Sequence, residues 1–384
     1  MAITCQIQPD AREKVQILGR AAQYDVCGEA CGTAASRKRD ELGRWIYPAV
    51  MPDGKKVALL KVLLSNACEK NCAYCVNRRG NDVRRTHFAP DELARLFDQM
   101  VQRRLVEGIF LSSGICSGAQ RTMDQLLSTI EIIRRRYQFR GYVHLKLLPG
   151  STRAQVERAG QIANRVSVNL EVPNRKRLGQ IAPNKTPDDV LNPMRWASEF
   201  MAKGNGRWAP AGQTTQFVVG AADESDQEIL TTVTHLYQKV SLHRAYFSAF
   251  QPVRGTPLEG HPYTPAWREH RLYQCDYLFR LYNFGFDELV FDQDGHLPRE
   301  TDPKTMWAKA HPEFFPIEIN RASQDALLRV PGVGPRSAVR IMRTRRQATL
   351  RTLMDLKKAG AVAKRAAPFV LLDGKKPPYQ LAFL

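Results

Sequence analysis

The amino-acid sequence predicts an α/β protein: a partial, open (β/α)6 barrel followed by a small all-α C-terminal domain. Two observations predict this fold. Between residues 57 and 285, apolar runs typical of strands alternate with segments of helical period, the pattern of a parallel sheet with right-handed crossovers. Beyond residue 316, short helical segments flank a glycine-rich turn. Six strands are too few to close an eight-stranded barrel, so we expect an open one.

The expected elements follow one another in a regular order. Strands are expected at residues 57–65, 108–112, 142–148, 165–172, 214–219 and 245–250. Helices are expected within 10–22 and at 90–104, 122–137, 152–160, 186–202, 226–240 and 267–282. Proline and acidic residues mark helix starts near Pro90 and Pro187. The expected domains are an N-terminal extension packed on the core (1–56), the barrel core (57–285), a linker (286–316) and a helical region (317–384).

The composition indicates a cytoplasmic protein that acts without a membrane. The 384 residues are 43% hydrophobic, enough for a sizeable core, and neither a leader-like start nor a membrane-length apolar stretch is present. The eight cysteines include three that are tightly bunched, which favours metal binding in a reducing compartment over a disulfide framework.

The charge is strongly basic, and the excess is concentrated near the C-terminus. The formal net charge is +19, which suggests a polyanionic partner such as nucleic acid or an anionic membrane. Between Arg321 and Arg365, twelve basic residues stand against two acidic ones, Asp325 and Asp355. This short segment therefore carries over half of the excess.

The most specific chemical motif is Cys68-x-x-x-Cys72-x-x-Cys75, which follows the first expected strand. Three thiolates on one loop can bind one inorganic centre. A structural zinc site normally takes four protein ligands, whereas an iron–sulfur cubane held by three cysteines keeps one iron open. The alternatives are a zinc site completed by a distant fourth ligand and cysteines that pack without binding a metal.

The spacing of these cysteines, the aromatic Tyr74 before the last of them and the preceding strand resemble the radical S-adenosylmethionine (radical SAM) superfamily. The resemblance implies a 4Fe-4S cluster on Cys68, Cys72 and Cys75, whose open iron binds the amino and carboxylate groups of S-adenosylmethionine. Reductive cleavage then yields a 5′-deoxyadenosyl radical. An external reductant such as flavodoxin or ferredoxin is also implied, and the core fold of the family is the partial barrel expected above.

The resemblance also suggests where the cofactor amino group binds. Ser112-Ser113-Gly114 stands where the family carries a Gly-Gly-Glu-like turn, whose backbone carbonyls take that group. Gly-Gly-Glu itself is absent, so the position alone supports the assignment, and an ordinary tight turn is the alternative. Small residues suit the task because backbone must approach the ligand closely.

Further cofactor-binding candidates lie at other strand ends, where the site of such a sheet is found. Ser167, Asn169 and Glu171 are expected to share a face, and Asn169 or Glu171 is the candidate for the ribose hydroxyls. Lys146 could meet the cofactor carboxylate, although a solvated or core-rim lysine is an equal alternative. Tyr74, beside the cluster, and Gln216 are lesser candidates, and the turn at 251–258 is expected to form a backbone wall near the adenine.

The remaining cysteines carry weaker signals. Cys116 follows the Ser-Ser-Gly turn by two residues and is a candidate hydrogen donor to a substrate radical, as in the spore photoproduct lyase branch; a small buried residue is the alternative. Cys5, Cys27 and Cys31 could help hold a second metal centre or could be loop cysteines without a ligand role. Cys275 is expected to pack.

The second specific motif is a glycine hairpin between two short helices, Pro331-Gly332-Val333-Gly334-Pro335. Backbone N–H groups at such a turn and helix start bind phosphate oxygens. The stretch resembles the helix-hairpin-helix DNA-binding motif, with Arg336, Arg340 and Arg343 following on the second helix. Non-sequence-specific, salt-sensitive binding is expected. The alternative is a hairpin used for protein contacts or for packing.

Together the two motifs resemble DNA modification or repair radical SAM proteins. The resemblance implies an enzyme that acts on DNA, by abstracting hydrogen from a base or sugar. One alternative is an RNA-modifying radical SAM enzyme. Another is a non-catalytic DNA-binding protein whose iron–sulfur cluster is structural or senses redox state.

Overall fold

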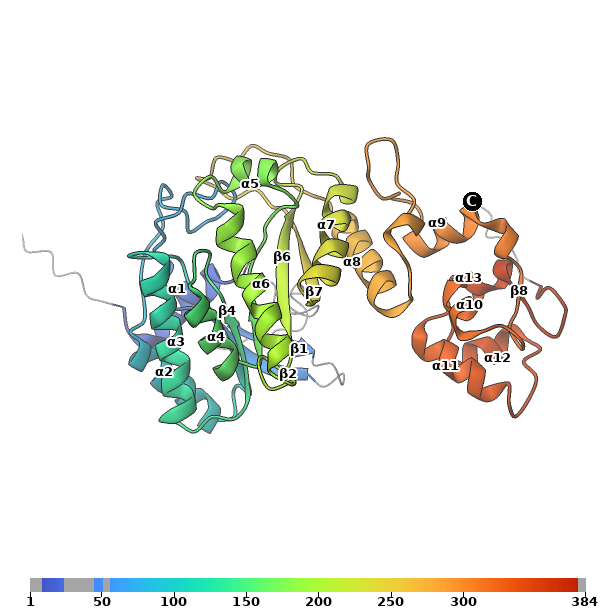
Figure 1. The fold of residues 1–384 in the computed structure, drawn as a ribbon, viewed down its shortest axis with the longest axis horizontal. Coiled ribbons are helices and arrows are strands. Elements are labelled where there is room, and N and C mark those ends of the chain that lie inside the picture. The colour runs from blue at the N-terminus through green and yellow to red at the C-terminus, as the bar shows by residue number, and fades with distance from the viewer. Residues whose placement is uncertain (1–8, 24–44, 51–55, 379–384) are drawn as a thin grey trace, which may run out of the picture. The chain divides into compact units, whose positions relative to one another are not determined.

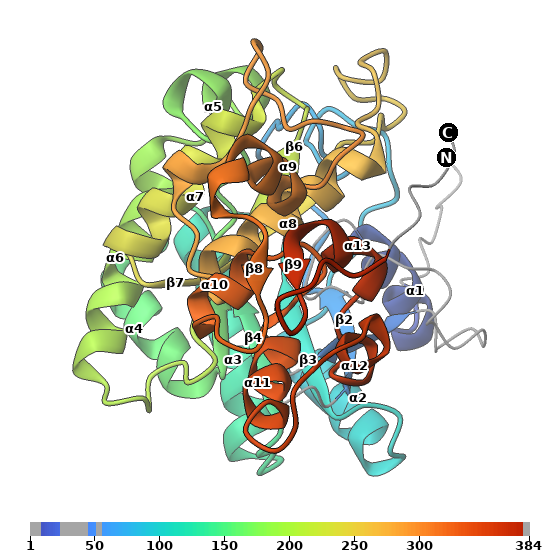
Figure 2. The same cartoon turned by 90° about the vertical axis from the view of Figure 1, so that its right-hand side faces the viewer.

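The computed structural model describes residues 9–23, 45–50 and 56–378. It divides into two compact units: one contains residues up to Glu224 together with His235–Pro265, and the other contains Ser225–Thr234 and Ala266 onward. Figures 1 and 2 show their elements. No helix among the described residues is both long and apolar enough to cross a membrane.

The first unit is built on a curled sheet of seven strands in the order β1 to β7. Six neighbouring strands, β2 to β7, are parallel, as the alternating pattern predicted. Their bounds are β2 Lys56–Leu63, β3 Gly108–Ser112, β4 Tyr142–Lys146, β5 Arg165–Ser167, β6 Gln213–Val219 and β7 Leu242–Ala249. This is the α/β half-barrel that the sequence predicted.

The sheet contains one strand that was not predicted, and another strand is shorter than predicted. β1, Ile46–Val50, pairs antiparallel with β2 at the sheet edge, where only a cover was expected; its Pro48 is tolerated because edge strands can lack a ladder donor. β5 ends at Ser167 instead of Val172. The backbone leaves the strand there, and Glu171 has a φ of 71°, so the alternation expected for Ser167, Asn169 and Glu171 does not continue to Glu171.

Helices α2, α3, α4 and α6, which follow strands in sequence, cover one face of the sheet (Figure 1). The helices up to β7 are α1 Ala11–Ala21, α2 Pro90–Gln102, α3 Ala119–Arg135, α4 Arg153–Ile162, α5 Arg175–Ile181, α6 Pro187–Lys203 and α7 Asp226–Lys239. Thr152 and Thr186 cap α4 and α6 with side-chain oxygens that accept the N–H of the third helical residue. The amphipathic α3 buries its predicted apolar side, including Met123 and Ile130.

The second unit is mainly helical and has its own core. Its elements are α8 Ala266–Leu281, the 3-10 turns Phe286–Glu288 and Pro312–Phe314, α9 Pro303–Ala310, α10 Gln324–Arg329, α11 Pro335–Thr344, α12 Leu353–Lys358, α13 Ala363–Ala366, the 3-10 turn Ala367–Phe369, and the short parallel pair β8 Ile317–Glu318 and β9 Val370–Leu371. The helices α10 to α13 gather around β8 and β9 (Figure 2). Ile319, Leu327, Ala338, Ile341 and Leu356 are among the buried residues that form this core.

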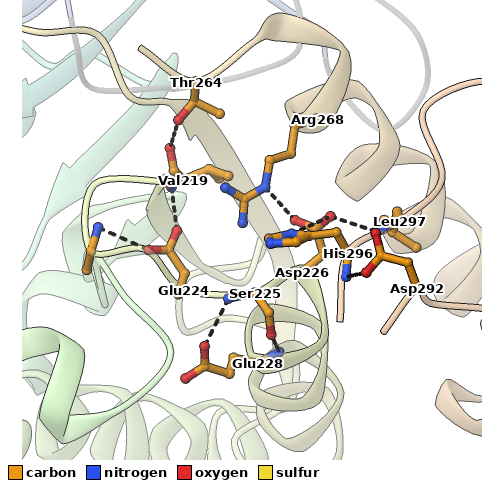
Figure 3. A network of polar contacts seen from close by, with 12 residues as sticks. Val219, Glu224, Ser225, Asp226, Glu228, Thr264, Arg268, Asp292, His296 and Leu297 are labelled. Atoms are coloured by element: carbon orange, nitrogen blue, oxygen red, sulfur yellow. Dashed lines mark hydrogen bonds and ion pairs between the residues drawn. The ribbon is translucent and has the colours of Figure 1, made fainter. Parts of the chain in front are cut away.

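A buried carboxylate joins the first turn of α7 to the rest of the second unit (Figure 3). Asp226 accepts hydrogen bonds from Arg268 Nε at 2.7 Å and from the Leu297 N–H at 2.9 Å. The His296 ring nitrogen Nδ1 lies 3.6 Å from the same carboxylate. Since Asp226 has no exposed surface, these partners are what make its burial tolerable.

Candidate active site

The cysteine loop leaves the carboxyl end of β2, where the predicted site belongs in a parallel sheet. Cys72 is buried, and Cys68 and Cys75 are partly exposed. The loop is tied to the turn after β3: the Glu69 N–H donates to the Ile115 carbonyl at 2.7 Å, and the Gly114 N–H donates to the Ser65 carbonyl at 2.7 Å. The three cysteines are therefore presented on a loop that the sheet anchors.

Gly114 is required by the close approach of these two segments. A Cβ atom at this position would lie 2.5 Å from the Ala67 carbonyl oxygen and 3.1 Å from Cys68 Cβ. Any side chain would push the turn away from the cysteine loop. The predicted Ser112-Ser113-Gly114 turn is thus placed beside the cysteines; Ser112 is buried, and Ser113 Oγ donates to the Gly114 carbonyl.

Arg85 organises the far side of the loop, a role that no sequence pattern predicted. Its guanidinium donates to four backbone carbonyls at 2.6 to 2.9 Å, those of Asn66, Asn77, Arg78 and Asn81. The turn after β7 also lies against this side, because a Cβ on Gly255 would meet Asn81 Oδ1. One cation thereby closes a loop that has no regular secondary structure of its own.

The segment from α5 to α6 supports the loop from the other direction. The Ala73 N–H donates to the Ile181 carbonyl at 2.7 Å, and the Asn71 N–H donates to Asn184 Oδ1 at 3.0 Å. Next to these contacts, Lys185 Nζ donates to Glu171 Oε1 at 2.7 Å, and both side chains are nearly inaccessible to solvent, 9% and 4% exposed. Lys185 carried no recognisable signal in the sequence, since it simply precedes the α6 cap.

Electrostatic effects connect this ion pair to the cysteines. Burial lowers the pKa of Lys185, but the Glu171 carboxylate and then Cys72 outweigh burial and raise that pKa. Burial, followed by the charge of the neighbouring Cys72, raises the pKa of the Cys75 thiol to about 12. Burial followed by the charge of Glu171 raises the pKa of Tyr74 well above its usual value. Tyr74, Glu171, Lys185 and the cysteines therefore form one electrostatic unit.

Two properties of the site fit an iron–sulfur cluster with an open position. The donors are three thiols on one loop. Among the described residues, no group of three His, Cys, Asp or Glu side chains is arranged to hold a single metal ion. A cubane does not need such a group, because each cysteine binds a different iron and the cysteine sulfurs do not meet at one point. Among the described residues, the second Glu171 oxygen, Oε2, is buried without a hydrogen-bond partner, and it can accept a hydrogen bond from a ligand.

The other predicted site residues fall into distinct environments. Lys146 and Gln216 are buried on the sheet, and Asn169 is partly buried. Cys116 is exposed, so the alternative of a small buried residue is wrong, whereas Cys275 is buried as expected. The roles assigned to these residues stay predictions. Cys5, Cys27 and Cys31, suggested for a second centre, lie outside the described residues.

The half-barrel and its three-cysteine loop define a class of enzyme domain that uses an iron–sulfur cluster. Residues 62–236 match the sequence model of the radical SAM superfamily, so this part of the chain is a radical SAM domain. Its cofactors are a 4Fe-4S cluster and S-adenosylmethionine, as predicted. No protein of curated function matches the chain.

Solved structures share parts of this fold at low sequence identity. HydG, a maturase of the FeFe-hydrogenase, is 17% identical with a TM-score of 0.46, covering 57% of this chain and 49% of that one. HydG from Carboxydothermus hydrogenoformans is 17% identical with a TM-score of 0.47, covering 57% and 50%. Methylornithine synthase (PylB) is 14% identical with a TM-score of 0.43, covering 53% and 56%. The chain thus matches about half the length of these proteins, and their substrates say nothing about its own.

Proposed function

We propose that this protein is a radical SAM enzyme that acts on DNA, with the radical SAM domain performing the chemistry and the glycine hairpin holding the phosphate backbone. The observation that carries the DNA part is the hairpin between α10 and α11. Gly332 has a φ of 83°, and a Cβ there would lie 2.6 Å from the Val362 carbonyl oxygen. The turn therefore depends on glycine for both its conformation and its packing.

The hairpin exposes donors of the kind that bind phosphate. The N–H groups of Gly332 and Gly334 donate no hydrogen bond within the described part of the chain, and Gly334 is the N-cap of the ten-residue helix α11. Backbone donors at a helix N-terminus attract anions. Val333 offers no such donor, because its side chain is 1% exposed and its N–H donates to the Val330 carbonyl at 3.1 Å.

Exposed cations continue from this turn along α11. Arg336, Arg340 and Arg343 are all exposed and are spaced by four and three residues, so they share one side of the helix. Arg345 is different: its guanidinium donates to the Ile319 and Ala322 carbonyls at 3.0 and 2.6 Å. It supports the fold of the region and is not a phosphate contact in this proposal.

The two parts then have separate tasks. The cluster, when bound, supplies the electron that cleaves S-adenosylmethionine and yields the 5′-deoxyadenosyl radical. Cys68, Cys72 and Cys75 hold the cluster, Arg85 and Gly114 keep their loop in place, and the buried Lys185–Glu171 pair excludes water beside it. A target base in duplex DNA would have to leave the stack to reach the sheet.

Salt-dependent DNA binding tests the hairpin half of the proposal. Binding of a fluorescent duplex is measured between 50 and 300 mM salt for the full chain and for the triple variant Arg336→Gln, Arg340→Gln, Arg343→Gln. Each phosphate contact contributes about −0.9 to the slope of the log binding constant against the log salt concentration. The slope for the variant should therefore be less steep by roughly 2 to 3, and the variant should bind DNA more weakly. The matched control, Arg95→Gln, Arg103→Gln, Arg135→Gln, removes equal charge from exposed positions on or next to α2 and α3.

The outcomes separate the alternatives. Equal weakening in both triple variants would mean that net charge, and not the hairpin, binds DNA. Preference for single-stranded RNA over duplex DNA would favour the RNA-modifying alternative. A hairpin-dependent duplex affinity without any cleavage of S-adenosylmethionine would favour the non-catalytic sensor.

A further inference from the structure

The sheet of the first unit carries an unusual set of side chains on one face. Lys61, Phe110, His144 and Arg165 are register partners across the four neighbouring strands β2 to β5. The next row toward the carboxyl ends contains Lys146, Ser167, Thr214 and Arg244 on β4 to β7. Since side chains alternate along a strand, these two rows share a face, and neither contains an acidic residue.

The other face is apolar, so the two rows lie on the face opposite the helices. Residues alternating with the rows include Ile109, Leu111, Val143 and Leu145, all fully buried. Helix α3 buries a complementary apolar side, and helices cover one face of the sheet (Figure 1). The polar rows therefore face the inside of the half-barrel.

Three of the cations in these rows are buried. Lys61 is 0% exposed, and Lys146 and Arg165 are each 8% exposed. Within the described residues, Arg165 forms no ion pair: its Nε donates to the Ala211 carbonyl at 3.1 Å and its NH1 to Tyr246 Oη at 3.4 Å. A buried charge whose partners are neutral is costly unless an opposite charge joins it.

Two buried polar atoms on the same face lack a partner within the part of the chain that the structure describes. His144 and Thr214 are each 1% exposed, and neither His144 Nδ1 nor Thr214 Oγ1 makes a hydrogen bond to a described residue. His144 Nε2 is occupied by Ser167 Oγ at 2.9 Å, so the ring is oriented while Nδ1 stays vacant. Such atoms are rarely left unpaired in native proteins.

The positive charges of these rows act on His144. Burial lowers the pKa of this histidine well below its usual value, and Arg165, Lys146 and Lys61, in that order, lower it further. Three cations from β2, β4 and β5 thus act on one neutral imidazole. An anion placed among them would be attracted by all three, and a neutral imidazole can turn an N–H toward it.

We propose that this face of the half-barrel binds a phosphate group, held by Arg165, Lys61 and Lys146 and completed by His144 and Thr214. A tetrahedral oxyanion offers several acceptor oxygens to donors that approach from several strands, which suits the guanidinium and ammonium groups present. The site is separate from the hairpin and does not depend on it. The phosphate could be free or belong to a nucleotide, and the chemistry of the site is the same in both cases.

Thermal unfolding of the full, anaerobically reconstituted protein tests the proposal. Ligands that bind only the folded state raise the Tm. Sodium phosphate and dAMP are titrated separately at constant ionic strength, with sodium chloride as the ionic control. We expect phosphate to raise the Tm. An equal effect of both probes indicates a site for free phosphate, and a much lower half-saturating concentration of dAMP indicates that the phosphate belongs to a nucleotide.

Two substitutions and one control identify the residues responsible. Arg165→Met and Thr214→Val should each weaken phosphate binding about tenfold or more, as expected for the loss of a charge-assisted or buried hydrogen bond. Without phosphate they should keep or raise the Tm, because they remove an uncompensated charge and an unpaired hydroxyl. Arg134→Met is the control: its guanidinium donates four hydrogen bonds, to the Ile162, Phe139 and Gly141 carbonyls and to Asn164 Oδ1, so it should lower the Tm and leave the phosphate effect unchanged.

Several results would overturn the proposal. One is the absence of a Tm change with either probe. Another is a phosphate effect that survives in Arg165→Met. A third is displacement of phosphate by S-adenosylmethionine, which would assign this face to the cofactor instead of to a separate phosphate.

Discussion

Lys185 and Glu171 form a buried ion pair beside the cysteine loop, with Nζ and Oε1 2.7 Å apart. Glu171 stands just beyond β5, in a backbone conformation with positive φ, and Lys185 immediately precedes α6. The pair therefore joins a strand end to a helix start next to Cys72, whose charge acts on Lys185.

Breaking this pair on one side should destabilise the radical SAM domain. Lys185→Met leaves a buried carboxylate without its cation, which typically costs about 3 to 5 kcal/mol. The double variant Lys185→Met, Glu171→Gln should recover a large part of this loss. Urea unfolding measures both. The control Arg158→Met breaks a more exposed pair with Glu131 and should cost less than about 1 kcal/mol; an equal cost for the two single variants would contradict the importance of burial.

Arg85 should be needed to load the cluster. A lysine keeps the charge but cannot reach four carbonyls from one planar group, so Arg85→Lys should lower the iron and sulfide bound per chain after reconstitution. Each lost hydrogen bond to a charged donor is worth about 1.5 kcal/mol or more. Arg79→Lys, on the same loop at an exposed position, is the control. Normal cluster content in Arg85→Lys would show that the loop holds its shape without these bonds.

Gly114→Ala should separate the Ser-Ser-Gly turn from the cysteine loop. The added methyl would lie 2.5 Å from backbone, and backbone can yield only by moving one of the two segments. We expect the variant to bind less cluster than the unaltered protein, as measured by the cluster absorbance near 400 nm, and to bind S-adenosylmethionine more weakly. Gly179→Ala is the control, because no atom lies within 4 Å of its Cβ position and it sits inside α5; it should stabilise the fold slightly. Equal cluster content in the two variants would refute the packing argument.

The Asp226–His296 contact should make the stability of the second unit depend on pH. The Asp226 carboxylate beside it raises the pKa of His296. Burial raises the pKa of Asp226, but His296 and Arg268 outweigh burial and hold that pKa below its usual range.

The sign of the dependence follows from these two directions. The histidine contribution is complete below about pH 6.5, the ordinary histidine pKa, and is lost as pH rises through the higher folded value. The aspartate contribution is present above about pH 3.9 and is lost as pH falls through its lower folded value. The Tm difference between the protein and His296→Gln should thus be largest near pH 5 to 6 and shrink by pH 9. His270→Gln, at an exposed position of α8, should show no such trend, and a constant difference for His296→Gln would contradict the linkage.

The sequence was sufficient to predict the six parallel strands because each is an apolar run followed by a helical period. It was also sufficient to place the three cysteines on a loop after β2, and their role as cluster ligands stays a prediction. β1 was missed because Pro48 argues against a strand everywhere except at an edge. Arg85 and Lys185 were missed for another reason: their partners are backbone carbonyls and a distant carboxylate, which only the folded chain brings within reach. The cationic rows on the sheet were hidden similarly, because Lys61, His144 and Arg165 are isolated residues until the strand register aligns them.

The most direct measurement of the central claim is production of 5′-deoxyadenosine by the anaerobically reconstituted, reduced protein with S-adenosylmethionine, in the presence and absence of damaged and undamaged duplex DNA. We expect 5′-deoxyadenosine to form, to disappear in Cys72→Ala, and to rise with DNA in the unaltered protein but not in the triple hairpin variant. If S-adenosylmethionine stays intact while the cluster is bound, the chain is not the enzyme proposed. If 5′-deoxyadenosine forms but no DNA changes its rate, the radical chemistry stands and the DNA substrate does not.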